Sequence, residues 1–84
     1  MRAPLPMTAA EWTTRLERSR QALNSWLHEA RLPWADNELM LSIAETEIGA
    51  LTHYVPYLPI GMRDSVRPLV RDWDEFRLVL VERC

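Results

Sequence analysis

Apolar residues recur at helical spacing along most of this chain, and three proline-containing triplets divide it. Leu5-Pro6-Met7, Leu32-Pro33-Trp34 and Leu58-Pro59-Ile60 each precede a segment with helical periodicity. Because proline disfavours helix in the residue before it, each triplet marks a boundary. The pattern predicts an all-α chain of three helices in a single domain spanning residues 1–84, in which residues 1–7 form an N-terminal arm.

The first predicted helix covers about residues 8–31. Thr8 and Glu11 have the spacing of a capping box, and Met7 and Trp12 occupy the positions of a hydrophobic staple around it. Pro33 ends the helix near residue 31. One face of this helix is predominantly apolar and is expected to pack on the core. Its members are Trp12, Leu16, Ser19, Leu23, Trp26, Leu27 and Ala30.

A second helix is predicted over about residues 37–53, with Asp36 or Asn37 as its N-cap. Its apolar face comprises Met40, Ile43, Ala44, Ile48, Leu51 and Val55. Leu39 and Leu41 flank that face on its two sides. Glu47 is the one polar residue well inside it, which predicts either an ion pair with an arginine of another helix or a specificity role at an interface.

The third helix is predicted over about residues 65–82, capped by Asp64 or Ser65, with Pro68 in its first turn. Its apolar stripe comprises Val66, Leu69, Trp73, Phe76 and Leu80. The run over residues 76–82 is also compatible with a strand. We favour helix, because the rest of the chain offers no convincing partner strand.

Composition narrows the classes of function. Hydrophobic residues make up 48% of the 84 residues, and the net charge is −2, which argues against a dominant attraction to nucleic acid or anionic membranes. All ten basic residues are arginine, which indicates GC-rich coding and a bacterial source. There is one cysteine, Cys84, and we see neither a secretory signal nor a membrane-spanning run. A cytoplasmic location is therefore expected.

The sequence predicts no catalytic, cofactor-binding or metal-binding residues, and no cofactor. His28 and His53 have no ligand partners at metal-site spacing. The acidic cluster around Trp73 diverges around a helix, so it does not converge on one ion. Its members are Asp72, Asp74 and Glu75.

Three arginines of the third predicted helix are spaced to line one side of it: Arg63, Arg67 and Arg71. Interleaved acidic residues favour an ordinary solvated face. Contact with phosphates or an acidic partner is the second interpretation, and it supports the alternative hypothesis of a nucleic-acid-binding regulator.

Excess apolar surface is the remaining signal. One helix face cannot bury Leu78, Val79, Leu80 and Val81 together. We therefore expect a three-helix bundle or open helical hairpin completed by dimerisation or by a protein partner. No membrane is expected as a partner, and nucleic acid is expected only under the alternative hypothesis. The predicted function is that of a small non-enzymatic regulator or adaptor, such as an antagonist, anti-activator or assembly subunit. Its candidate partner-binding residues are Trp34, Leu39, Leu41, Glu47, Trp73, Leu78, Val79 and Val81.

Overall fold

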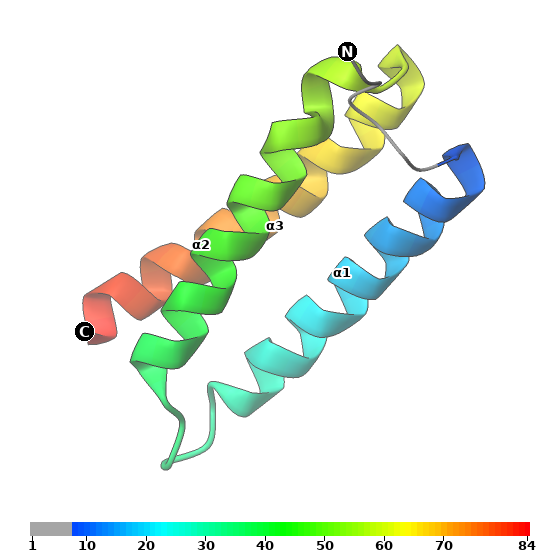
Figure 1. Ribbon diagram of the computed structural model, residues 1–84. Coiled ribbons are helices and arrows are strands. Elements are labelled where there is room, and N and C mark those ends of the chain that lie inside the picture. The colour runs from blue at the N-terminus through cyan, green and yellow to red at the C-terminus, as the bar shows by residue number, and fades with distance from the viewer. Residues whose placement is uncertain (1–7) are drawn as a thin grey trace.

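The computed structural model describes residues 8–84 as three helices joined by two short connections (Figure 1). They are α1 (Ala9–Glu29), α2 (Asn37–Tyr54) and α3 (Ile60–Arg83), with a single 3-10 turn, η1 (Val55–Tyr57), before α3. The three helices alternate in direction, α1 and α3 running one way and α2 the other, in a bundle measuring 45 × 22 × 18 Å (Figure 1). The described residues contain no strand, so the all-α class is confirmed.

The start of α1 follows the predicted capping box. The Glu11 amide donates to Thr8 Oγ1 at 3.1 Å, and the Thr8 amide donates to Glu11 Oε1 at 2.8 Å. These bonds satisfy two amides that the first turn of a helix leaves without partners. Met7, the other half of the predicted staple with Trp12, lies outside the described residues.

Asp36 is the N-cap of α2, one of the two residues expected in that role. Its side chain accepts a hydrogen bond from the Leu39 amide at 3.0 Å. The helix ends at Tyr54, one residue beyond the predicted end.

The prediction for the start of α3 is wrong by five residues. The helix begins at Ile60 with Pro59 as its N-cap, so Asp64 and Ser65 are not caps. Pro59 suits that role because it lacks an amide hydrogen and has a fixed φ. Pro68 consequently lies inside the helix, not in its first turn. Its exposure leaves water free to bind the carbonyl that loses its helical partner.

Helical structure continues through residues 76–82 to Arg83, which rules out the alternative strand. The predicted stripe of α3 is fully buried and forms the centre of one hydrophobic core shared by all three helices. The core comprises Trp12, Leu23, Met40, Ala44, Leu51, Leu58, Val66, Leu69, Trp73, Phe76 and Leu80.

Polar contacts fix the relative register of α1 and α3. Arg20 Nη1 lies 2.7 Å from Asp72 Oδ2, Trp73 Nε1 donates to Ser19 Oγ at 2.9 Å, and Arg83 Nη1 donates to the Ala30 carbonyl at 2.8 Å. Ala30 lies about three turns beyond Ser19 and Arg20 on α1, and Arg83 lies about three turns beyond Asp72 and Trp73 on α3, so the two helices run parallel. The last turn of α3 therefore lies beside the end of α1.

Candidate protein-interaction surface

Exposed apolar side chains gather at one end of the bundle, which we call the Trp34 end. It comprises the end of α1, the α1–α2 connection, the first turn of α2 and the last turns of α3 (Figure 1). Among residues 8–84, eight large hydrophobic side chains are exposed; six of them lie at this end, and Tyr57 and Ile60 lie at the opposite end. The six are Leu27, Trp34, Leu39, Leu78, Val79 and Val81.

Trp34 is the most exposed of the large hydrophobic residues at this end, with 73% of its surface open to solvent. It sits in the connection between α1 and α2, where the Ala35 amide donates to the Leu32 carbonyl at 3.1 Å. This tight turn presents the indole away from the core. An exposed, large aromatic side chain on a hydrogen-bonded turn has the properties of an interface anchor.

The last turns of α3 expose apolar residues because this helix has only one face against the core. Leu69, Phe76 and Leu80 take that face and are buried. Leu78 projects to the opposite side and is 49% exposed, while Val79 and Val81 lie on the two flanks and are also exposed. The structure thus leaves these three predicted residues open to a partner.

Trp73 must be withdrawn from the predicted partner-binding set. It lies in the buried stripe of α3, and its indole N–H donates to Ser19 Oγ at 2.9 Å. Ser19 is buried as well, so this bond supplies a partner for both polar groups inside the core. Leu41 is half-buried and packs against the same core, which leaves little of it for docking.

Glu47 forms the ion pair that its position on α2 predicted. Arg15 of α1 reaches both carboxylate oxygens, with Nη1 to Oε2 at 2.6 Å and Nη2 to Oε1 at 2.9 Å. Burial raises the pKa of Glu47, but the hydrogen bonds and charge of Arg15, aided by the Ser19 hydroxyl, outweigh it and bring the pKa below its usual value. The carboxylate is therefore used within the chain.

The predicted arginine stripe is only partly free. Arg63 donates through Nε to the Leu58 carbonyl at 2.8 Å and through Nη2 to the Pro56 carbonyl at 2.9 Å, so it holds the α2–α3 connection together. Arg67 and Arg71 are exposed, with Asp64 at 4.0 Å and Asp72 at 3.7 Å as their respective acidic neighbours. Two of the three arginines remain available to solvent.

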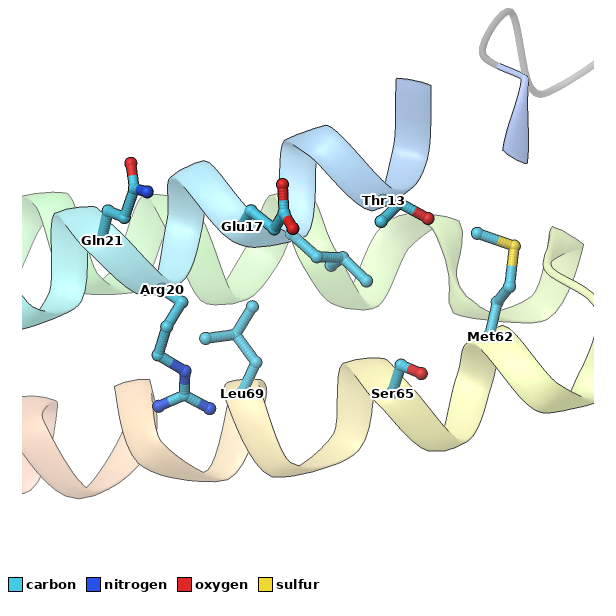
Figure 2. A pocket seen from close by; sticks show the side chains of 8 residues that line it. Thr13, Glu17, Arg20, Gln21, Met62, Ser65 and Leu69 are labelled. Atoms are coloured by element: carbon cyan, nitrogen blue, oxygen red, sulfur yellow. The ribbon is translucent and has the colours of Figure 1, made fainter. Parts of the chain in front are cut away.

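A groove of about 540 Å³ opens between α1 and α3, and Figure 2 shows its lining. Met62 and Leu69 point from α3 toward α1, while Glu17 and Gln21 point away from α3 at the rim. The Thr13 and Ser65 hydroxyls each donate to a backbone carbonyl of their own helix. These hydroxyls are thus bound to backbone carbonyls and not to a base.

Within residues 8–84, no three His, Cys, Asp or Glu side chains are grouped so as to hold a metal ion. None of the described helices combines the length and apolar character needed to cross a membrane.

Three exposed apolar residues among residues 8–84 were missed by sequence reasoning: Leu27, Tyr57 and Ile60. Leu27 was assigned to the core face of α1, but it lies at that face's edge and is exposed. Ile60 was placed outside the third helix because the helix was predicted to begin too late. Pro59 was the available signal, since proline at a helix start fixes the first turn without costing a hydrogen bond.

We compared the chain with protein-family models, curated proteins and solved structures, and none of the three comparisons gave a match.

Proposed function

We propose that this chain is a small regulatory or adaptor protein that acts by docking its Trp34 end on another protein, without chemistry of its own. One observation carries the proposal: exposed apolar side chains gather at the Trp34 end although all three helices are already packed. A surface that the fold itself leaves apolar in several adjoining elements is typical of an interaction site.

The energetics of burial support this reading. Burying a leucine side chain stabilises a complex by about 1.5–3 kcal/mol relative to leaving it in water. Trp34 adds a large aromatic group whose N–H can donate to a partner while its rings fill an apolar pocket. The partner expected from this chemistry is a protein with a hydrophobic groove or pocket that accepts an indole.

The nucleic-acid alternative has less support. Arg63 is held by two backbone carbonyls, and the acidic side chains nearest Arg67 and Arg71 reduce their field. A protein that binds nucleic acid through phosphate contacts needs several free cations on one surface. The apolar Trp34 end is therefore better supported than the arginine stripe as the binding surface.

The proposal is tested by Trp34→Ala, with Tyr57→Ala as the matched control at the opposite end. The immobilised wild-type chain is incubated with soluble proteins of the organism that encodes it, and captured proteins are identified and purified for titration. We expect Trp34→Ala to weaken binding of the purified partner by about tenfold or more, as for an interface anchor. Tyr57→Ala should bind like the wild type.

Leu39→Asp provides a second variant on a different element of the same end. It should weaken binding of the same partner, because a carboxylate on the first turn of α2 would be desolvated in the complex. If both Trp34→Ala and Leu39→Asp bind every captured protein with wild-type affinity, the Trp34 end is not a docking surface and the proposal is wrong.

A further inference from the structure

The outward side of α3 carries a self-complementary row of residues, which we call the outer row. Ile60, Arg67, Asp74 and Val81 are spaced seven residues apart. Seven residues are almost two whole turns of helix, so each side chain of the row is rotated by only about 20° from the one before it, and the row runs obliquely from the outward side at Ile60 toward the flank at Val81. In order they are apolar, basic, acidic and apolar. Read in reverse beside itself, the row sets apolar against apolar and basic against acidic.

All members of the outer row are accessible. Ile60 is 75% exposed, the highest value among the large hydrophobic residues, and Val81 is 45% exposed. The Arg67 side chain is 74% exposed, and its nearest acidic neighbour, Asp64, lies 4.0 Å away. Asp74 accepts from Arg77 Nε through Oδ1 at 2.8 Å, so one contact uses one of its two carboxylate oxygens.

The charge of the whole helix has the same polarity as the outer row. Residues 60–71 contain three arginines and one aspartate, a net charge of +2. Residues 72–83 contain four carboxylates and two arginines, a net charge of −2. Two such helices attract each other when antiparallel and repel each other when parallel.

The α2–α3 groove lies beside the middle of the outer row. Its volume is about 520 Å³, and Arg67, Arg71 and Asp74 stand among apolar residues of both helices. The apolar lining is Ile48, Val55, Pro56, Val66 and Val70. This surface can receive the aliphatic part of an arginine side chain from another molecule while its charged head forms an ion pair.

We propose that two copies of this chain associate α3 against α3, antiparallel, about a two-fold axis that passes between Val70 and Arg71. This axis sets Ile60 against Val81 of the second copy and Arg67 against Asp74 of the second copy. Because the arrangement is isologous, each pair occurs twice. The inference deepens the proposed function, on which it rests, by naming a second copy as one partner of the apolar surface of α3.

The same axis places Arg71 close to Arg71 of the second copy, where the like charges repel each other. Arg71→Ala should therefore strengthen the association. An acidic protein or a nucleic acid bound at this surface would instead be weakened by the loss of that cation, so the direction of the change identifies the occupant.

The expected association is modest. A helix of 24 residues is about 36 Å long, and contact along one of its sides is smaller than the ~800 Å² per partner of a standard stable interface. Sedimentation velocity over protein concentrations from about 1 µM to about 1 mM covers the dissociation constants appropriate to such a contact.

Charge reversal tests the pairing directly. Arg67→Asp and Asp74→Arg should each weaken self-association by about tenfold or more. Mixed together, the two variants should form heterodimers as well as the wild type forms homodimers, because both ion pairs are restored. The double variant, Arg67→Asp with Asp74→Arg, should recover homodimers. Arg18→Asp and Glu17→Arg make the same charge changes on exposed positions of α1 and should associate like the wild type.

Cysteine cross-linking tests the direction of the helices, in a chain in which Cys84 is replaced by serine. Ile60→Cys and Val81→Cys should form a disulfide with each other when mixed, and neither should do so alone. Self-cross-linking of Ile60→Cys would show a parallel pair and overturn the proposal. A wild type that stays monomeric at about 1 mM would overturn it as well.

The two proposals fail separately. Trp34 and Leu39 lie outside the outer row, so Trp34→Ala should leave self-association unchanged while losing the captured partner. If the wild-type protein is monomeric but still needs Trp34 to bind its partner, only the dimer proposal is wrong. If the dimer responds to the Arg67 and Asp74 reversals as expected but no partner depends on Trp34, only the proposed docking function is wrong.

Discussion

Two polar contacts inside the bundle show how single residues tie α1 to the other helices. Ser19 accepts from Trp73 of α3, and Arg15 binds Glu47 of α2. Each lies in or beside the apolar core, where a polar group without a partner destabilises the fold. The two contacts start from positions four residues apart on α1, so they fix its rotation about its own axis.

Glu47 makes the stability of the fold depend on pH, and the surroundings of its carboxyl determine the direction of that dependence. Burial raises the pKa of this carboxyl, but Arg15 and Ser19 together lower it below the ordinary value of 4.5. A carboxyl whose pKa is depressed by folding stabilises the native state above its unfolded pKa. That contribution is lost as the pH falls from about 4.5 through the lower pKa of the folded state.

We predict that Glu47→Gln reduces this acid sensitivity. The variant should be less stable than the wild type at about pH 7, because it lacks the charged partner of Arg15. The difference should narrow at about pH 3, below the ordinary pKa of a glutamate, because the wild type there loses part of the stability that its depressed pKa supplies. Urea unfolding at the two pH values measures the free energies.

Glu45→Gln, on the exposed side of the same helix, is the matched control for this experiment. It should retain the acid dependence of the wild type. An unchanged gap between wild type and Glu47→Gln at both pH values would show that the Arg15 ion pair does not couple stability to pH.

At the scale of the elements, the start of α3 is built by the connection that precedes it. Leu58 is buried, Pro59 fixes the first turn, and Arg63 donates to the carbonyls of Leu58 and Pro56. Because the connection supplies these contacts, the helix begins at Ile60 without a side-chain cap. The earlier start puts Ile60 in phase with Arg67, Asp74 and Val81.

Pro68→Ala tests where α3 begins. Proline inside a helix costs about 3 kcal/mol relative to alanine, partly offset by about 0.4–1 kcal/mol from the stiffer unfolded chain. Since Pro68 lies inside the helix and is exposed, the alanine variant should be more stable by about 1–3 kcal/mol in chemical denaturation.

Pro33→Ala serves as the control, because it should change the free energy of unfolding in the opposite direction. Pro33 lies in the α1–α2 connection, where proline breaks no helical hydrogen bond, so its loss should destabilise the fold by about 0.4–1 kcal/mol. A Pro68→Ala variant no more stable than the wild type would place Pro68 in a first turn, as the sequence pattern predicted.

At the scale of the whole molecule, the protein is a narrow three-helix bundle with one hydrophobic core. Three helices enclose a single row of buried side chains, and every helix keeps a broad outward side. A chain of this size buries only about 60–65% of its unfolded surface. The apolar residues that find no room in the core must face solvent or another molecule.

Leu78→Asp should therefore weaken self-association while leaving the stability of the folded monomer nearly unchanged. Leu78 is half exposed and lies off the core face, so the free energy of unfolding of the monomer should change by only about 0.5 kcal/mol, as for ordinary surface positions. Self-association should fall, because Leu78 flanks Val81 at the end of the outer row and the new carboxylate would be desolvated there.

Leu27→Asp is the control for this comparison, since Leu27 has a similar exposure at the same end of the bundle but lies on α1. It should leave sedimentation behaviour unchanged. Equal self-association of wild type and Leu78→Asp over the whole concentration range would show that this side of α3 is ordinary surface.

The sequence by itself determined the helices and most of the core. Local signals suffice for these features: a capping box at Thr8, a cap at Asp36, and apolar residues repeating every three or four positions. It also predicted, as one of two alternatives, that Glu47 pairs with an arginine of another helix, because a carboxylate on an apolar face needs compensation. Helical periodicity likewise showed that a single face of the helix cannot bury Leu78, Val79 and Val81 together with the core residues.

Tertiary structure alone decided the remaining features. The sequence placed Trp73 both in the apolar stripe and among the partner-binding residues, and only the structure shows that Ser19, distant in sequence, accepts its N–H inside the core. Arg63 was removed from the arginine stripe by carbonyls of a connection whose path no local pattern specifies. The gathering of Trp34, Leu39 and Leu78 at one end depends on how three helices are arranged in space. Periodicity describes each helix about its own axis, and only packing sets which sides of different helices lie together.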